Sequence, residues 1–358
     1  MKEKAMIAMS GGVDSSVAAL LMQRAGYDCM GVTMKLYEGE SVSDKTCCTA
    51  DDAQDAKAVA LRLGMPHYVF NFTEDFDRQV IRRFVEVYEA GDTPNPCIDC
   101  NRYLKFFRLW ERARALGCDY IVTGHYARVE QRRDGRWLLK KGLNEDKDQS
   151  YVLYTLTQEE LARTRFPLGG MSKAEVRTLA EENGLVNAKK RDSQDICFVP
   201  DGDYGAFIRG YTGKDYPAGD FVDESGKVLG KHTGMIGYTI GQRRGLGVSG
   251  GRKLYVCQKR MEENTVVLAD NDRLFSRRLL ARDINLIPFD GLDKPLRCKA
   301  RIRYKHAEQP ATVTQIGQDM IEVVFDEPQR AITTGQAVVL YDDDLVLGGG
   351  TIWQTEDT

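Results

Sequence analysis

The sequence predicts an α/β protein that begins with a doubly wound parallel sheet and ends with an antiparallel β-barrel. Three observations lead to this fold class. Short apolar runs alternate with amphipathic helical segments over the first third of the 358 residues, glycines are concentrated between 202 and 251, and strands with tight turns follow residue 276. Strands joined by helices of about a dozen residues or more pair in parallel, with helices on both faces. We therefore expect a parallel-sheet domain at 1–203, a small glycine-rich, β-leaning domain at 204–274 and the barrel at 275–358.

Each element of the first domain has a local reason in the sequence. Apolar residues at helical spacing, with a glycine at the end of each pattern, predict helices at 13–26, 50–63, 74–90 and 104–116. The apolar runs between them predict strands at 5–9, 27–36, 67–72 and 119–124. Thr49 and Asn101 are the expected N-caps of the second and fourth helices. Pro94 and Pro96 are expected to prevent regular structure before the fourth helix.

Later segments carry turn and capping signals. Asp134-Gly135 lies between two strand-like segments and predicts a β-hairpin on an otherwise α/β unit. No convincing helix is expected among the glycines of the second domain. Two capping boxes, each of which predicts a short helix, are Thr157 with Glu160 and Ser172 with Glu175.

Charge and cysteine usage narrow the class of protein. The 50 Lys and Arg against 53 Asp and Glu leave a net charge of −3, so the bulk charge gives no sign of a nucleic-acid partner. No apolar run approaches the roughly 18 residues of a membrane span, and no signal peptide is expected. Nine cysteines without an export signal indicate reduced thiols. We therefore expect a cytoplasmic enzyme or binding protein with no membrane association.

A phosphate-binding loop is predicted between the first strand and the first helix, at SGGVDSS, residues 10–16. Adjacent glycines bring bare backbone N–H groups against an anion, Ser15 and Ser16 add hydroxyl donors, and the helix adds the positive end of its dipole. A carboxylate beside phosphates repels them unless it binds a metal or the loop backbone, so Asp14 predicts Mg²⁺ nearby. The alternative is a tight turn with incidental serines, which does not account for the whole heptad between a strand and a helix.

The SGGxDS motif resembles the signature of the PP-loop ATP pyrophosphatases, which cleave ATP between its α- and β-phosphates and adenylate an oxygen of their substrate. The resemblance implies that ATP binds at the loop and at the carboxyl ends of the second and fourth strands. The implied ATP-binding residues are Ala8, Met9, Ser10, Gly11, Gly12, Val13, Asp14, Ser15, Met34 and Gly124.

Thiols are the candidates to displace an adenylated oxygen. Cys97 and Cys100 form a C-x-x-C motif just before a helix, whose N-terminal dipole favours thiolate, and Cys197 lies in a strand-like segment that ends the first domain. A structural zinc site is an alternative that needs a second ligand pair, which only Cys47-Cys48 could supply. The cysteines expected to be small buried hydrophobic residues are Cys29, Cys118, Cys257 and Cys298.

Six segments identify one family. SGGVDSSVAA, TPNPCIDCNRYLKF, DYIVTGHYARV, NEDKDQSYVLY, DSQDICFVP and YTIGQRRGLG occur in this order along the first 250 residues and resemble the bacterial tRNA-specific 2-thiouridylases. That family replaces O2 of the wobble uridine with sulfur. The resemblance implies that Cys100 is a nucleophile or resolving thiol and that Cys197 carries a persulfide. The implied loop for the target base consists of Asn95, Pro96 and Cys97.

One position departs from the family pattern. Many members have Asp where this chain has Cys97, and Asp99 lies on the other side of the expected extended segment, so we do not transfer the role of that Asp to it. Cys97, Cys100 and Cys197 could instead hold a [4Fe–4S] cluster with one open iron. A persulfide relay through Cys100 and Cys197 is the preferred alternative.

Local basic residues predict RNA contacts that the net charge hides. Five cations alternate with apolar residues, so they would lie on one face of a strand about 6.6 Å apart, with no anion among them. They are Arg297, Lys299, Arg301, Arg303 and Lys305. A solvated barrel face is the alternative interpretation. The tRNA contacts that the family resemblance implies are His125, Lys147, Asp148, Gln149, Arg303, Tyr304 and Gln336.

The expected activity is ATP-dependent 2-thiolation of the wobble uridine of tRNA. Uridine O2 is adenylated with release of pyrophosphate, and a cysteine persulfide then delivers sulfur as AMP leaves. The implied cofactors are ATP and Mg²⁺, and the implied partners are tRNA and an upstream sulfur donor. Two alternatives are an ATP pyrophosphatase that forms C–N bonds, which thiol alkylation would not affect, and an RNA-binding protein that senses ATP and releases no pyrophosphate.

Overall fold

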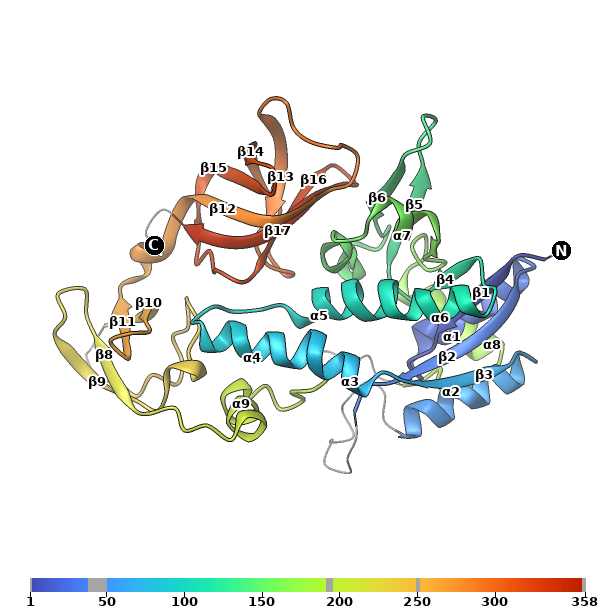
Figure 1. The fold of residues 1–358 in the computed structure, drawn as a ribbon, viewed down its shortest axis with the longest axis horizontal. Helices are drawn as coiled ribbons and strands as arrows, with labels where there is room; N and C mark the ends of the chain where they lie inside the picture. The colour runs from blue at the N-terminus through green and yellow to red at the C-terminus, as the bar shows by residue number, and fades with distance from the viewer. Residues whose placement is uncertain (1, 38–49, 191–195, 249–251, 356–358) are drawn as a thin grey trace.

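The computed structural model describes residues 2–37, 50–190, 196–248 and 252–355. It contains a parallel sheet with helices on both faces, a smaller four-stranded sheet and a closed antiparallel barrel (Figure 1). In the view of Figure 1, the parallel sheet and the N-terminus lie at one end and the yellow and orange four-stranded sheet at the other, with the orange and red barrel above the long helices. The predicted fold class is confirmed.

The parallel sheet has the strand order β3-β2-β1-β4-β7. Its central strand β1 is buried on both faces, because Ala5 and Ile7 pack into one apolar cluster and Met6 into another. A strand covered on both faces is apolar throughout rather than alternating, which explains its sequence. The strands are β1 (Lys4–Ala8), β2 (Asp28–Lys35), β3 (His67–Asn71), β4 (Tyr120–Val122) and β7 (Thr164–Arg165).

Three helices cover one face of this sheet. They are α1 (Val13–Arg24), α2 (Ala50–Arg62) and α8 (Lys173–Glu182). Small residues such as Ala18, Ala56 and Ala180 are buried where these helices meet the strands, which lets the helices approach closely. Thr49, the expected N-cap of α2, lies outside the described residues.

A long helical hairpin covers the other face. Its first helix runs through α3 (Thr73–Phe76), η1 (Asp77–Ile81) and α4 (Arg82–Glu89), and its second through α5 (Pro96–Asp99), η2 (Cys100–Arg108) and α6 (Leu109–Ala115). The two helices run antiparallel, since Arg83 contacts Asp99 at 3.6 Å and Arg108 contacts Asp75 at 3.2 Å. In the described ranges, none of the helices combines the length and the apolar character that a membrane crossing requires.

The second helix of the hairpin begins earlier than expected. Asn95 is its N-cap, and the Asn95 side chain accepts a hydrogen bond from the backbone N–H of Cys97. Pro96 occupies the first helical position, where a missing N–H is harmless and the fixed φ suits the helix. Asn101 is buried inside the helix and does not cap it. Residues 92–95 are irregular as expected, but the expectation is wrong for Pro96, which begins a helix, and the C-x-x-C motif lies in the first helical turns.

The predicted hairpin forms at Asp134-Gly135, from β5 (Ala127–Gln131) and β6 (Trp137–Lys141). It belongs to the barrel sheet and not to the α/β unit, because β6 pairs with β17 (Leu345–Thr355). The two capping boxes are confirmed and open α7 (Gln158–Ala162) and α8. Two short 3₁₀ helices lie between the hairpin and α7, at η3 (Glu145–Lys147) and η4 (Ser150–Leu153).

The four-stranded sheet has the order β10-β11-β8-β9 and buries Phe221 and Leu268. Its strands are β8 (Gly219–Val222), β9 (Val228–His232), β10 (Tyr255–Arg260) and β11 (Thr265–Ala269), with a 3₁₀ turn η5 (Met235–Gly237). A helix, α9 (Tyr204–Thr212), precedes it, so the expectation of no helix is wrong. Gly205 and Gly210 weaken the helical signal, but the Asp203 side chain caps the helix by accepting from the N–H of Ala206.

The C-terminal part is a closed six-stranded barrel. Its order is β12-β15-β14-β13-β16-β17, and β12 also pairs with β17, which closes the sheet. Alternate residues such as Val313, Ile321 and Val323 fill the interior. After η6 (Asn271–Leu274), the remaining strands are β12 (Phe275–Leu286), β13 (Leu296–Arg301), β14 (Gln309–Gly317), β15 (Met320–Arg330) and β16 (Ala337–Asp342).

Candidate active site

The phosphate loop lies between β1 and α1, as predicted. Gly11 has φ +75°, and a Cβ at this position would lie 2.3 Å from the backbone oxygen of Asp52. Only glycine tolerates both the conformation and the close approach. Gly12 is the N-cap of α1 and makes no side-chain cap, so the backbone N–H groups of the first turn are available to an anion.

The serine hydroxyls of the loop are turned inward. Ser15 and Ser16 both donate to the carbonyl oxygen of Gly12 at 3.0 Å, and the Ser10 N–H donates to Ser15 Oγ at 3.2 Å. Ser16 is fully buried. Because each hydroxyl has one proton, the hydroxyls of Ser15 and Ser16 are both used inside the loop in this structure. The backbone N–H groups in the first turn of α1 have no side-chain cap and are the donors best placed for an anion at this end of the loop.

Asp14 is balanced by a lysine of the same chain. Lys173 Nζ lies 2.8 Å from each carboxylate oxygen of Asp14, and the Tyr126 hydroxyl donates to Asp14 Oδ1 at 2.8 Å. The expectation of a metal rested on the need for positive charge beside this carboxylate, and Lys173 supplies that charge.

The other expected ATP-binding residues lie around the loop. A Cβ at Gly124 would lie 2.8 Å from the backbone nitrogen of Ser15, so the end of β4 touches the loop. Met9, Val13 and Met34 are buried in the apolar clusters, and Ala8 is partly buried. These four side chains belong to the core, so their contribution to a nucleotide site is limited to their backbone atoms.

The C-x-x-C motif lies at the start of the second hairpin helix. Cys97 is exposed, whereas Cys100 is half-buried and packs against the larger apolar cluster. Residues three apart lie on the same side of a helix, so the two thiols share a face. Asp99 lies between them in the sequence, beside Arg83, and burial raises the pKa of its carboxyl group to about 6.

Cys197 approaches the same helical hairpin. Its Sγ lies 3.4 Å from the hydroxyl oxygen of Tyr37. The ring of the next residue, Phe198, packs against Phe76 and Phe84 of the first hairpin helix, with centroid distances of 5.8 and 5.0 Å. Cys197 and Cys100 pack against one apolar cluster. The structure thus brings the segments that carry both thiols against the same helix.

The three thiols of the alternative cluster do not form a ligand set. Within the described parts of the chain, no group of three or more His, Cys, Asp or Glu side chains is arranged to hold a metal ion. Cys47-Cys48, the second half of the zinc alternative, lies outside the described residues.

The remaining described cysteines are unreactive by their surroundings. Burial raises the pKa of the Cys118 thiol, of the Cys29 and Cys257 thiols to about 11, and of the Cys298 thiol to about 12. A thiol with such a pKa stays protonated near neutral pH and is a poor nucleophile. Cys29 and Cys118 are buried as predicted, whereas Cys257 and Cys298 are only partly buried.

The barrel holds the segment that precedes the C-x-x-C motif. Gln336 Nε2 donates to the carbonyl oxygens of Thr93 and Pro94, at 2.9 and 3.1 Å. The N–H of Thr93 donates to the carbonyl oxygen of Thr334 at 3.0 Å, and the Thr334 hydroxyl donates to Asp92. The side-chain amide of Gln336, an expected tRNA contact, is therefore used inside the chain to position this segment.

Two other expected tRNA contacts are buried. His125 is only 8% exposed, its Nδ1 lies 2.6 Å from Thr123 Oγ1, and burial holds its pKa well below the ordinary value. Asp148 is 5% exposed, and its Oδ1 accepts from the N–H groups of Gly142 and Ser150. In this conformation neither side chain reaches a surface ligand.

Four expected contacts remain near the surface. Tyr304 is 38% exposed and donates to the carbonyl oxygen of Asp148 at 3.1 Å, and Lys147 is partly exposed in η3. Gln149 Oε1 accepts from the N–H of Tyr126 at 3.0 Å. Arg303 donates to the hydroxyl of Thr333 at 2.9 Å and to the carbonyl of Ala331. Of these four, Tyr304 is exposed, and Lys147, Gln149 and Arg303 are partly exposed.

The predicted strip of five cations on one strand face does not form. β13 ends at Arg301, so Arg303 and Lys305 lie beyond the strand. Arg297 pairs with Asp326 at 2.8 Å, and Arg301 pairs with Glu308 at 2.9 Å. These acidic partners lie outside the alternating segment 297–305, so the pattern within that segment did not show them. Lys299 and Lys305 are exposed and have no ion-pair partner among the residues that the structure describes.

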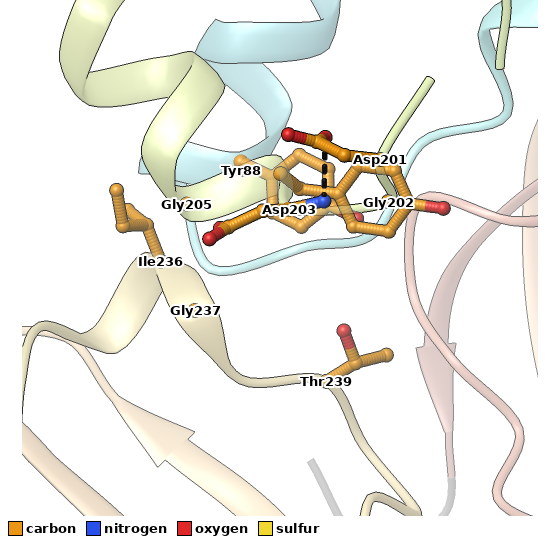
Figure 2. Close-up of a pocket in the computed structure, with 9 residues that line it drawn as sticks. Tyr88, Asp201, Gly202, Asp203, Gly205, Ile236, Gly237 and Thr239 are labelled. Atoms are coloured by element: carbon orange, nitrogen blue, oxygen red, sulfur yellow. Dashed lines mark hydrogen bonds between the residues drawn. The ribbon is translucent and has the colours of Figure 1, made fainter. Parts of the chain in front are cut away.

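A cavity of about 280 Å³ separates the hairpin from the four-stranded sheet (Figure 2). Tyr88 of α4, Asp201, Asp203 and Thr239 contribute to its lining, and the N–H of Asp203 donates to Asp201 at 3.1 Å. Asp201, which lines the cavity, lies four residues after Cys197 in the sequence. None of the expected site residues lines it, so it is distinct from the phosphate loop.

Sequence reasoning missed three residues that contact the loop. Lys173 and Tyr126 bind Asp14, and Asn187 binds the loop backbone. They lie more than 100 positions from the loop along the chain, and no spacing or motif links them to it. A contact between side chains that are so distant in sequence is visible only in the folded chain.

Comparison with known proteins adds family information. Family models match the chain over three segments: a tRNA methyl transferase HUP domain at 3–201, a tRNA methyl transferase PRC-barrel domain at 205–270 and an aminomethyltransferase beta-barrel domain at 276–352. Curated relatives named tRNA-specific 2-thiouridylase MnmA include proteins from Clostridioides difficile (strain 630) and Carboxydothermus hydrogenoformans. The first is 49% identical over 355 residues and the second 50% identical over 356 residues, each covering 98% of both chains.

Solved structures show only distant likeness. A 4-thiouridine synthetase–RNA complex with bound ATP is 20% identical, with a TM-score of 0.38, and the match covers 55% of this chain and 44% of that one. An NMN synthetase from Francisella tularensis is 16% identical, with a TM-score of 0.33, and covers 60% and 78%.

Proposed function

Because this chain belongs to the family of tRNA-specific 2-thiouridylases, we propose that it replaces O2 of the wobble uridine of tRNA with sulfur. The observation that carries the proposal is the packing of the Cys100 and Cys197 segments against one helix of the hairpin that covers the sheet. The proposed substrates are tRNA and Mg²⁺-ATP, and the proposed partner is a protein that supplies sulfur.

The first step is adenylation of the uridine. The base leaves the stack so that its O2 can approach the nucleotide, because an atom inside a stack is not accessible. O2 attacks the α-phosphorus of ATP, a new O–P bond forms, and the bond to the bridging oxygen breaks with release of pyrophosphate. The N–H groups at Gly12 and the first turn of α1 are suited to bind the leaving pyrophosphate, with Lys173 nearby.

The second step transfers sulfur. The terminal sulfur of a Cys197 persulfide attacks C2 of the adenylated uridine, and AMP leaves with the former O2. The Cys100 thiolate then attacks Sγ of Cys197, which breaks the S–S bond to the uridine sulfur and leaves a thiocarbonyl at C2. The two cysteines end as a disulfide, so a thiol reductant must reduce them before the donor protein loads Cys197 again.

The test separates adenylation from sulfur transfer. Cys197→Ser is expected to keep tRNA-dependent pyrophosphate release and to form no thiouridine, and Cys100→Ser is expected to form little because the mixed disulfide is not resolved. Cys257→Ser, in the four-stranded sheet, is the matched control and should leave both unchanged. Pyrophosphate release and nucleoside analysis of digested tRNA are the measurements. Thiouridine made at the normal rate by Cys197→Ser would remove Cys197 from the mechanism.

Two other outcomes identify the alternative functions. Full ATP-dependent activity after alkylation of all thiols would favour an enzyme that forms C–N bonds. ATP and tRNA binding without pyrophosphate release would favour an RNA-binding protein that senses ATP. Protein purified without air should contain no stoichiometric iron if the relay through Cys100 and Cys197 is correct.

The remaining assignments follow from the same proposal. We place the domain borders at 203/204 and 274/275, and we assign Asn95, Pro96 and Cys97 to the loop that receives the target base. This loop lies at the start of the second hairpin helix, which carries Cys97 and Cys100 and is called the cysteine helix below. Gln336 of the barrel holds the residues just before it.

A further inference from the structure

We propose that Asn187 is a positioning residue that turns a backbone N–H group of the phosphate loop toward the pyrophosphate of ATP. The inference rests on the proposed ATP-dependent adenylation and deepens it. Asn187 lies in the turn that follows α8 and is only 3% exposed.

The side-chain amide of Asn187 reaches the back of the loop. Its Nδ2 donates to the carbonyl oxygen of Gly11 at 2.9 Å and to Ser16 Oγ at 2.8 Å. Ser16 in turn donates to the carbonyl oxygen of Gly12 at 3.0 Å. One buried amide thus uses its two protons to anchor two consecutive peptide groups of the loop, the second of them through Ser16.

The orientation of the Gly11–Gly12 peptide follows from this anchor. In a planar trans peptide, the C=O of one residue and the N–H of the next point in opposite directions. When Asn187 holds the Gly11 oxygen at the back, the N–H of Gly12 must point to the opposite side of the loop. In the described part of the chain, no group accepts a hydrogen bond from this N–H, so it is available to an anion.

The loop needs such an anchor because of its glycines. Gly11 and Gly12 give this peptide more rotational freedom than any other pair of residues would. A rotated peptide would present the Gly11 oxygen to the pyrophosphate, and two acceptors repel each other. The glycines that permit the close approach of a phosphate therefore make the orientation dependent on Asn187.

A purely structural role explains Asn187 less well. Its Oδ1 is buried and has no hydrogen-bond partner within the described residues. A buried amide that leaves one polar atom unsatisfied lowers the stability of the fold, so an apolar residue would serve packing alone better. The retained amide is explained by its two donors.

The experiment compares Asn187→Ala and Asn187→Asp with Asn183→Ala in the full chain. Asn183 is the matched control, because its amide lies at the end of the same helix, donates to Leu179 and accepts from Arg24, and does not touch the loop. The affinities of Mg²⁺-pyrophosphate and of AMP are measured by calorimetry, and the KM for ATP and kcat by tRNA-dependent pyrophosphate release. Thermal unfolding reports the stability of each variant.

Asn187→Ala is expected to weaken pyrophosphate binding about tenfold, the value of one hydrogen bond, and to raise the KM for ATP by a similar factor. AMP affinity and kcat should stay within about twofold of the wild type, and Asn183→Ala should match the wild type. Asn187→Asp keeps the size of the side chain but removes both donors, so it should lose at least as much. If Asn187→Ala does not fold, Asn187→Asp tests whether the Asn187 donors are needed for pyrophosphate binding.

Equal pyrophosphate affinity in the wild type and both Asn187 variants would overturn the inference. A parallel loss of AMP and pyrophosphate affinity would also overturn it, since it would indicate general damage. A wild-type chain that binds pyrophosphate but releases none with tRNA would contradict the proposed function alone, and the affinity ratio would still decide the role of Asn187. A wild-type chain without pyrophosphate affinity would contradict both.

Discussion

Asp99 lies beside Cys100 at the start of the cysteine helix and is the most perturbed carboxyl group near the candidate site. Burial raises its pKa to about 6, and the nearby Arg83 and Arg102 only partly offset this effect. Arg83 approaches to 3.6 Å but does not hydrogen-bond closely, and Arg102 is bound to Asp283 instead. The ionised form of Asp99 therefore lowers the stability of the folded chain.

The sign of this effect predicts a pH dependence. The pKa of Asp99 is higher in the folded chain than in the unfolded chain, so the folded state binds the proton more tightly. The stabilisation of the fold by the protonated Asp99 carboxyl group is therefore fully present below about pH 4 and is lost as the pH rises to about 6. Asn at this position cannot ionise. We expect Asp99→Asn to be more stable than the wild type by about 1–2 kcal/mol at pH 7.5, and to lose this advantage at pH 4.5.

Urea unfolding at the two pH values measures this difference. Asp326→Asn is the control with the opposite sign, because the ion pair with Arg297 lowers the pKa of Asp326, and its removal should destabilise the chain at pH 7.5. An Asp99→Asn variant less stable than the wild type at pH 7.5 would show that the pair with Arg83 outweighs the effect of burial.

At the residue scale, local chemistry was predictable and distant contacts were not. The φ of Gly11 and the free N–H groups of the loop follow from a strand, two glycines and a helix in sequence. The inward turn of Ser16 and the charge supplied by Lys173 do not follow, because both depend on segments far along the chain. A motif therefore identifies the ligand class but not all the residues that bind it.

At the scale of elements, the start of the cysteine helix shows that a proline can indicate either the end or the beginning of a helix. Proline inside a helix breaks it, but proline in the first position is favoured. The Asn95 cap decides between them, since its side chain satisfies the N–H of Cys97 and lets the helix begin at Pro96. The same ambiguity applies to Asp134-Gly135, which correctly predicts a hairpin but not the barrel strand β17 that pairs with it.

We expect Asn95→Ala to lower the free energy of unfolding by about 1 kcal/mol, because one N–H of the first turn loses its partner. Asn95→Asp keeps an acceptor at the same place and should retain most of the stability. Asn144 is a matched control: it precedes η3 but makes no side-chain cap, so Asn144→Ala should change little. Urea unfolding of the three variants is the measurement. Equal losses at 95 and 144 would show that the cap does not stabilise the cysteine helix.

At the scale of the whole molecule, the barrel holds the start of the helix that carries Cys97 and Cys100. Gln336 and Thr334 of the barrel bind the residues before the C-x-x-C motif, and Asp283 of β12 binds Arg102 with two hydrogen bonds of 2.5 and 3.0 Å. The order of the domains was predictable from the sequence, in which alternating strands and helices are followed by a glycine-rich stretch and then by strands with tight turns. Their docking was not, because it depends on polar pairs and on an apolar cluster whose members are far apart in the sequence, which no periodicity reveals.

The charge of the whole molecule leads to a final prediction, about RNA binding. With a net charge of −3 the protein does not attract RNA as a whole, so local unpaired cations must make the phosphate contacts. Arg297 and Arg301 are neutralised by Asp326 and Glu308, which leaves the exposed Lys299 and Lys305 as the better candidates on this edge of the barrel.

Replacing both lysines with Gln should make the salt dependence of tRNA binding shallower by about 1.4–1.8 in the slope of log K against log salt concentration, from about 0.7–0.9 for each lost phosphate contact. Arg297→Gln should leave the slope unchanged, because Asp326 already balances that charge. Filter binding of tRNA between low and moderate salt measures both slopes. If Arg297→Gln made the slope shallower and the double lysine variant did not, the RNA would have displaced Asp326. The phosphate contact would then lie at the start of β13, at Arg297, and not at the two lysines.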